Sequence, residues 1–235
     1  MPQLPLLDVL YEDNHVLAVD KPAGLPTMGV AADKPSLLAI AKEYIRVKYD
    51  KPGNVYLGTL SRLDAPVTGV VIFARTSKAA SRLTSQFVAR TVEKSYWALV
   101  PGRVDPDEGQ CIDWLRKDER HRKMHICQPT TDGAQEAILS YDTLLNARGH
   151  TLLKIALKTG RKHQIRLQLS HRGWPILGDR KYQSEAAFPA GIALHARQLI
   201  VEHPTQKQEL KIEAPLPKSW RKWVSVDVER SLAEL

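Results

Sequence analysis

The chain has 235 residues, of which 43% are hydrophobic and 26% charged, a balance typical of a globular protein rather than a disordered or fibrous one. Lysine and arginine number 34 against 26 acidic residues, so the net charge is +8. No apolar run approaches the length of a membrane span, and the first eight residues lack the basic and apolar segments of a secretory signal. With only two cysteines, at unrelated positions, we expect a reduced, cytoplasmic compartment and no membrane.

The first part of the chain predicts strands and helices in mixed order. Residues 9–11 and 16–19 read as two strands around a polar turn, and residues 69–74 read as a buried strand. Ser36 is placed to cap a helix, and Ser77 is placed to cap a second one. Apolar residues recur at helical spacing on the first helix: Leu37, Ala41, Tyr44 and Ile45.

Further strands dominate the rest of the chain. They are predicted at residues 94–100, 137–145, 150–157, 192–201 and 208–212. Residues 101–135 are rich in glycine, proline and charge, and predict a loop-dominated excursion. His163 to Arg172 reads as a short helix that ends at Gly173. Because strands and helices mix without regular alternation, we expect an α+β fold with a mixed, mainly antiparallel sheet in a single domain.

Positive charge is concentrated in one stretch. Between Lys154 and Tyr182 there are eight basic residues and one acidic residue, a local net charge of +7. A second basic cluster occupies residues 116–123. Such fields attract polyanions, and the aromatic residues Trp174 and Tyr182 lie beside the arginines. The pattern favours a nucleic-acid partner over an ordinary solvated surface.

Two short segments carry candidate chemistry. The first, residues 61–69, contains Asp64, and the second, residues 159–166, ends at Arg166. A loop aspartate beside proline and glycine is usually a turn former or a cap, but a carboxylate at the mouth of a buried strand is also well placed for catalysis. Arg166 is either a surface cation or the partner that keeps Asp64 ionised.

Other features give weaker signals. Tyr96 lies in the middle of a predicted strand, where most tyrosines belong to the core. His121 and His125 have a spacing that shares one helix face, but cations surround them and no carboxylate completes a metal site, so we predict no metal. No glycine-rich phosphate loop is present, and the glycines, including Gly69, are explained by turns and helix ends.

Several motifs in order resemble the RluA-type pseudouridine synthases. The resemblance runs from about residue 9 to residue 217, with a short tail at 218–235. Its motifs are residues 20–24, Arg62-Leu63-Asp64 with Thr68-Gly69, residues 93–100, residues 159–166, residues 173–179 with Tyr182, and residues 194–196. The resemblance implies the pseudouridine synthase fold, as one catalytic domain over residues 1–235.

The resemblance also implies a reaction, in which specific uridines of ribosomal or transfer RNA become pseudouridine without a cofactor. Asp64 would be the nucleophile, and whether it attacks C1′ or removes a ribose proton stays open. Tyr96 would stack on the flipped base and help to remove the C5 proton, while Arg166 would pair with Asp64. Arg62 would fill the gap left by the flipped base, since a base inside a helix must be extruded to be reached. The expected substrate-binding residues are Arg62, Arg161, His163, Gln164 and Ile176.

The chain departs from the family pattern in places. Ser61 stands where histidine is usual, Val67 and Thr68 stand where Thr-Ser is common, and Gln168 replaces a frequent histidine. We expect the chain to lack the small N-terminal S4-like RNA-binding domain of many relatives, and to act as a monomer.

Two other functions compete with this interpretation. The first is a catalytically silent RNA-binding protein on the same scaffold, which the presence of Asp64 disfavours. The second is a hydrolase that acts on a glycosidic bond. Such an enzyme normally needs a second carboxylate, and none lies near Asp64 in the sequence.

Overall fold

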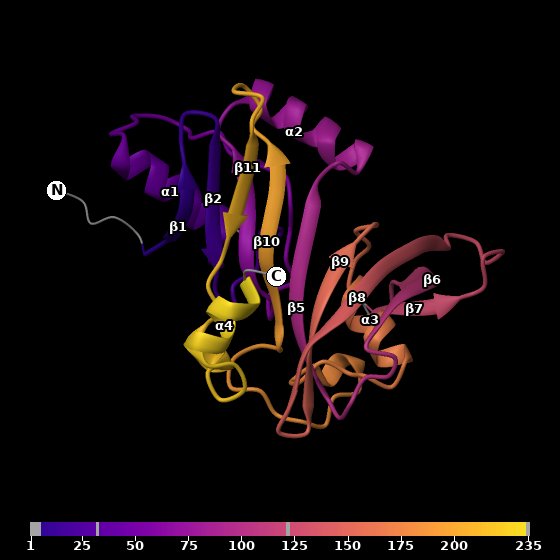
Figure 1. Ribbon diagram of the computed structural model, residues 1–235. Coiled ribbons are helices and arrows are strands. Elements are labelled where there is room, and N and C mark those ends of the chain that lie inside the picture. The colour runs from indigo at the N-terminus through magenta and orange to yellow at the C-terminus, as the bar shows by residue number, and fades with distance from the viewer. Residues whose placement is uncertain (1–5, 32, 121–122, 234–235) are drawn as a thin grey trace. The chain divides into compact units, whose positions relative to one another are not determined.

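The computed structural model describes residues 6–31, 33–120 and 123–233, and Figure 1 shows their secondary structure. The chain forms two compact units. Unit 1 consists of Met1–Glu93 and Ala196–Pro215, and unit 2 consists of Lys94–His195 and Leu216–Leu235. Each unit is therefore built from two separate stretches of sequence.

Unit 1 is a sheet with two helices. Its strands are β1 (Asp8–Glu12), β2 (Val16–Lys21), β3 (Gly58–Thr59), β4 (Thr68–Ala74), β10 (Leu194–Glu202) and β11 (Glu209–Glu213). β1, β2, β4 and β10 follow one another across the sheet, while β3 pairs with β4 and β11 pairs with β10. The pairs β1–β2, β2–β4, β3–β4 and β10–β11 are antiparallel. The strands predicted in this unit are confirmed.

The two helices of unit 1 begin at hydroxyl caps. In α1 (Leu37–Lys48), the Ser36 hydroxyl accepts a hydrogen bond from the Ala39 N–H, and the four residues of the predicted apolar face are the buried ones. In α2 (Ser77–Ala89) the cap is Thr76, whose hydroxyl accepts from the Ala79 N–H, so the prediction of Ser77 as cap was wrong by one residue. Either hydroxyl satisfies the pattern, and only the backbone geometry separates them.

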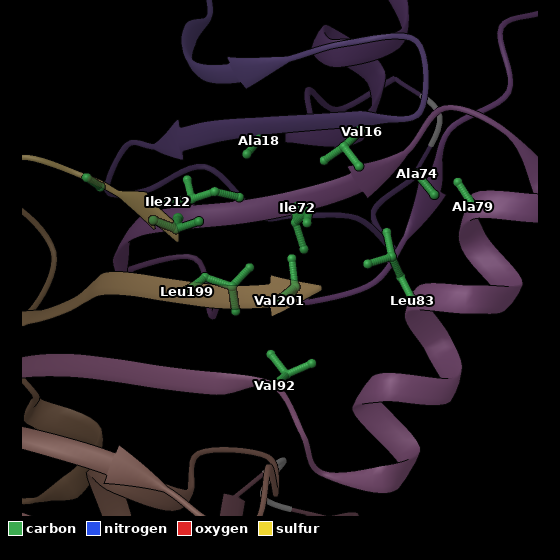
Figure 2. Packing of buried hydrophobic residues seen from close by; sticks show 12 residues of the cluster. Val16, Ala18, Ile72, Ala74, Ala79, Leu83, Val92, Leu199, Val201 and Ile212 are labelled. Carbon is green, nitrogen blue, oxygen red and sulfur yellow. The ribbon is translucent and has the colours of Figure 1, made fainter. Parts of the chain in front are cut away.

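One apolar cluster of unit 1 lies between its sheet and α2. Figure 2 shows aliphatic side chains from β2, β4, β10 and β11 packing with Ala79 and Leu83 of α2. All seven residues of β4 are buried, so this strand is covered on both faces. A loop that leads directly into β4 is therefore attached to a fully buried strand.

Gly69 is a close-approach residue of β4 rather than a turn residue. Its φ is +110°, and a Cβ at this position would lie 2.2 Å from the Ala196 carbonyl oxygen. No side chain fits there without moving the backbone of β10. The expectation that a turn explains this glycine was wrong, because the constraint comes from the neighbouring strand.

Unit 2 is built on a second run of antiparallel strands. They are β5 (Glu93–Pro101), β6 (Glu108–Asp118), β7 (Lys123–Cys127), β8 (Gln135–Ala147) and β9 (His150–Leu157), in the order β5-β9-β8-β6-β7. The strands predicted at 94–100, 137–145 and 150–157 are confirmed. The loop predicted over 101–135 was wrong, because β6 and β7 form a hairpin there and β6 also pairs with β8. Only Cys111 and Leu115 of β6 are buried, so the apolar signal of this strand is weak.

Helical segments complete unit 2. α3 (Gln164–His171) lies where a short helix was predicted, and Gly173 follows it with φ +80°. The 3-10 turns η1 (Arg180–Tyr182) and η2 (Lys218–Trp220) and the helix α4 (Val226–Ala233) follow. The region after residue 217, which was predicted to be a short tail, thus contains the helix α4.

The predicted α+β class, with a mixed and mainly antiparallel sheet, is confirmed. The expectation of a single catalytic domain stays a prediction. Across the part of the chain that the structure describes, no helix combines the length and the apolar character needed to span a membrane.

Candidate active site

Asp64 lies in the loop between β3 and β4 of unit 1, four residues before β4 begins. The backbone on both sides of it is fixed. Leu63 exchanges two hydrogen bonds with the buried Thr27 hydroxyl, which donates to its carbonyl at 2.9 Å and accepts from its N–H at 3.1 Å. On the other side, the Ala65 carbonyl accepts from the Gly24 N–H at 2.8 Å. Asp64 itself is half-buried, on a backbone that is held at the residues on both sides of it.

A tight turn continues from Asp64. The Val67 N–H donates to the Asp64 carbonyl at 3.0 Å, which closes the turn over residues 64–67 directly before β4. Pro66 occupies the third position of this turn, and because it has no N–H it leaves no backbone donor unsatisfied there. The local sequence therefore holds Asp64 against the start of a fully buried strand.

Lys21, at the end of β2, is the buried support of this loop. It has no exposed surface, and its Nζ donates to the carbonyls of Pro22 at 2.8 Å, Leu25 at 2.7 Å and Ala65 at 3.0 Å. Burial lowers the pKa of the Lys21 ammonium to about 8, while the nearby charges of Asp64 and Asp20 act in the opposite direction. One ammonium group thus ties the loop after β2 to the loop that carries Asp64.

Sequence reasoning assigned no role to Lys21. The alternation of residues along a strand gave a signal for this role. It places Lys21 on the same face of β2 as the apolar residues Leu17 and Val19, which are fully buried in the structure. A lysine that continues a buried face must find oxygen partners inside the protein. The sequence does not reveal that one partner, Ala65, lies 44 positions away.

Asp20 is a second ionisable group beneath the loop. Its Oδ1 is buried without a hydrogen-bond partner among the described residues. Burial, together with the charge of Asp8 on the paired strand β1, raises the pKa of the Asp20 carboxyl to about 6. A hydrogen bond from the Gly69 N–H and the charge of Lys21 partly oppose this shift.

Arg62, which was expected to contact RNA, is exposed at the surface of the same unit.

Arg166 lies on α3 of unit 2 and is buried. Its Nε and Nη2 donate to the two carboxylate oxygens of Asp179, at 2.7 and 2.8 Å. Its guanidinium also lies 5.1 Å from the centre of the Tyr182 ring. A bidentate ion pair and an aromatic face together fix the plane of the guanidinium.

Sequence reasoning did not pair Asp179 with Arg166. The expected pairing of Arg166 with Asp64 stays a prediction, because these residues belong to different units.

His163 and Tyr182 complete this cluster. His163 precedes α3 in the left-handed conformation, with φ +54°, and its Nδ1 lies 2.7 Å from the Tyr182 hydroxyl. The same hydroxyl accepts from the Met124 N–H of β7 at 3.1 Å. The tyrosine therefore links the start of α3, the guanidinium of Arg166 and the β6–β7 hairpin, all within unit 2.

Gln164 and Arg161 shape the loop that enters α3. The Gln164 side chain accepts from the Thr159 hydroxyl and the Arg161 N–H, at 2.8 and 2.9 Å, and donates to the Ile138 carbonyl at 3.1 Å. Arg161 Nε donates to the Glu136 carbonyl at 2.9 Å. These hydrogen bonds of both side chains support the protein's own loops and strands, and their expected contacts with substrate stay predictions.

The remaining expected site residues lie in unit 2. Tyr96 is half-buried in β5, opposite Ile155 of β9, and Ile176 has no exposed surface. The roles given to them from the resemblance stay predictions.

The metal signal weighed at His121 and His125 assumed a helix, whereas His125 lies on a strand. His121 lies outside the described residues, and His125 lies on β7, with its Nε2 3.2 Å from Asp118. Within the ranges 6–31, 33–120 and 123–233, no three His, Cys, Asp or Glu side chains cluster in a way that would hold a metal ion.

Several known proteins are similar to this chain in sequence or in fold. A family model described as RNA pseudouridylate synthase matches residues 15–171. Ribosomal large subunit pseudouridine synthase D of Pseudomonas aeruginosa is 34% identical over 232 residues, covering 91% of this chain and 69% of that protein. Dual-specificity RNA pseudouridine synthase RluA of Pasteurella multocida is 32% identical over 223 residues, covering 91% of this chain and 95% of that protein. The solved structure of human RNA pseudouridylate synthase domain containing 4 matches with a TM-score of 0.76 at 25% identity, covering 92% of each chain.

The chain therefore belongs to the RNA pseudouridylate synthase family, of the RluA type, whose members are isomerases that modify RNA. The resemblance inferred from the sequence motifs is confirmed, as is the expected class of enzyme.

Proposed function

We propose that this chain converts specific uridines of ribosomal or transfer RNA to pseudouridine, with Asp64 as the catalytic residue and without a cofactor. The observation that carries the proposal is the fixed loop around Asp64. Thr27 holds the residue before it, and Gly24 and Lys21 hold the residue after it. A preorganised carboxylate is what an attack on a bound ribose requires.

The reaction rearranges one nucleoside and leaves its composition unchanged. The bond between N1 and C1′ breaks, the uracil rotates while bound, and C5 forms the new bond to C1′. The proton on C5 is lost and N1 gains one, so atoms and electrons balance without an oxidant or a metal. Asp64 starts the sequence in one of two ways. It attacks C1′ as N1 leaves and is then displaced by C5, or it removes a ribose proton that returns to the ribose when C5 bonds to C1′.

Other residues are given supporting roles. Tyr96 stacks on the extruded base and assists removal of the C5 proton, and Arg166 pairs with Asp64. Arg62, which is exposed and lies two positions before Asp64, fills the gap that the extruded base leaves in the RNA. The remaining contacts with substrate are assigned to Arg161, His163, Gln164 and Ile176.

The choice of substrate follows the relatives. One of them is named for the ribosomal large subunit and another for dual specificity toward RNA. The positive charge of residues 154–182 supports binding of either RNA through its phosphates. We also propose that the chain forms a single catalytic domain and acts as a monomer in the cytoplasm.

The test is tritium release from RNA that carries C5-tritiated uridine, measured separately on ribosomal and transfer RNA. Wild type is expected to release tritium from at least one pool, and Asp64→Ala is expected to release none while its RNA affinity stays within about 3-fold. Asp132→Ala, which removes an exposed carboxylate in a turn of unit 2, is the matched control and should behave as wild type. RNA binding without release from either pool would instead support the silent RNA-binding function.

A further inference from the structure

Unit 2 contains a surface hollow of about 450 Å³ between β7, α3 and η1. We call it the Tyr182 hollow. Met124, Ile126 and Leu167 give it an apolar lining, and Leu167 and Ile126 also pack on the small cluster formed by Leu115, Met124 and Ala137. Its volume falls within the range of about 300–1,000 Å³ that is typical of sites for small organic groups.

Basic side chains surround this apolar lining. Lys123 and His125 come from β7, His171 from the end of α3 and Lys181 from η1, and none of the described residues that line the hollow is acidic. Asp118 of β6, which does not line the hollow, pairs with His125 at 3.2 Å. Two lysines therefore set the charge of the hollow, and they suit an anionic occupant.

The hollow is attached to the Arg166 cluster through Tyr182. Tyr182 lines the hollow, its ring faces the Arg166 guanidinium, and its hydroxyl binds His163 and the Met124 N–H. Leu167 and His171, which also line it, lie on the same short helix as Arg166. Any group bound in the hollow would sit next to a side chain that the proposed function places in the active site.

We propose that the Tyr182 hollow binds an unstacked nucleotide that flanks the target uridine, with its base against Ile126 and Leu167 and its phosphate on Lys123 and Lys181. This inference rests on the proposed function. Sequence-specific recognition of RNA relies on single-stranded bases that are splayed out and taken into pockets, while lysines hold the backbone. The apolar lining of the hollow suits the base of a nucleotide, and its cationic rim suits the phosphate.

The first test measures RNA affinity as a function of salt for Lys123→Ala/Lys181→Ala. Loss of two phosphate contacts should weaken binding about 10-fold and lower the slope of log K against log salt by about 1 to 2. The matched control is Lys42→Ala/Lys51→Ala, which removes the same charge from exposed positions of unit 1. Equal weakening by the two pairs would show a general charge effect and overturn the assignment of a phosphate site.

The second test locates the nucleotide. A photoreactive benzoylphenylalanine replaces His171, which is exposed on the rim, and cross-links to bound RNA are mapped by reverse-transcription stops. We expect stops at one or two nucleotides within a few positions of the pseudouridine. Stops spread along the RNA, or cross-links to protein only, would overturn the proposal.

Tritium release by the same photoreactive variant separates the two levels of inference. Activity with scattered or absent cross-links overturns the Tyr182 hollow while the proposed function stands. If wild type itself releases no tritium from any RNA, the proposed function fails first, and the subsite fails with it.

Discussion

The loop that carries Asp64 and the helix that carries Arg166 are held in place by different means. Around Asp64 the restraints act on the backbone, through Thr27 and Lys21, and the carboxylate is left half-buried. Around Arg166 the restraint acts on the side chain itself, which is buried against Asp179 and Tyr182.

This difference separates two kinds of site residue. A side chain on a loop that is held through its backbone can be replaced without breaking those backbone hydrogen bonds, so its loss should lower turnover more than stability. A side chain that is part of a buried ionic network cannot be replaced without leaving a partner unsatisfied. Substitutions in the two regions should therefore differ in how they divide between turnover and stability.

The largest loss of stability is expected at Asp179. Asp179→Asn removes the carboxylate that the buried Arg166 guanidinium binds in a bidentate pair, which should lower the free energy of unfolding by about 3 to 5 kcal/mol. Turnover should fall as well, because the guanidinium plane is no longer fixed. Urea denaturation and tritium release measure the two effects. The comparison variant is Asp113→Asn, whose partner Arg172 is more exposed, and it should lose less stability and keep its turnover. Equal effects of the two variants would contradict a special role of the buried pair.

A somewhat smaller loss is expected at Lys21. Lys21→Met removes the donor to three carbonyls and should lower the free energy of unfolding by about 3 kcal/mol, since unsatisfied buried acceptors are costly. Turnover should fall with it, because the restraint on the Ala65 side of Asp64 is lost. Lys42→Met, at an exposed position of α1, is the control. If Lys21→Met were as stable and as active as this control, the proposed restraint would not exist.

The pH dependence of stability should show the buried Asp20. Its pKa in the folded protein, about 6, lies above the unfolded value of 3.8, so its contribution to stability is fully present below about pH 4 and is lost as pH rises through 6. Relative to Asp20→Asn, wild type should therefore lose about 1–2 kcal/mol between pH 4 and pH 7, after allowance for solvent screening. Urea melts of both proteins across this range measure the difference. A difference that does not change with pH would show that Asp20 titrates normally.

The smallest effect is expected at Tyr182. Tyr182→Phe keeps the ring beneath Arg166 but leaves the Met124 N–H without its acceptor, which should lower the free energy of unfolding by about 1 kcal/mol. Tyr56→Phe, at an exposed position of unit 1, should change stability by less than about 0.5 kcal/mol. A loss at Tyr182 as large as that at Asp179 would mean that the hydroxyl, rather than the ion pair, holds the Arg166 cluster.

Local patterns in the sequence predicted much of the fold. Ser36 and the apolar residues that follow it at helical spacing give α1 its cap and its buried face, because both depend on near neighbours. The β6–β7 hairpin was missed, since β6 buries only Cys111 and Leu115 and is fixed mainly by backbone pairing with β8. The helix α4 lies in a region that was read as a tail.

The sequence suggests candidate site residues, whose roles stay predictions, but not the side chains that support them. Asp64 and Arg166 stand in recognisable motifs. Their partners are distant in the sequence, since Lys21 reaches Ala65 across 44 positions and Asp179 lies 13 positions from Arg166. Neither pairing has a local signature, because burial of a charge depends on the folded surroundings.

One comparison tests the account most directly: the rate of conversion of uridine to pseudouridine by Asp64→Asn, with enzyme in excess over RNA and nucleosides separated by chromatography. The account predicts a rate at least about 1,000-fold below wild type, with the RNA affinity kept within about 3-fold of wild type. Conversion by Asp64→Asn within about 10-fold of wild type would contradict the central claim that this carboxylate performs the chemistry.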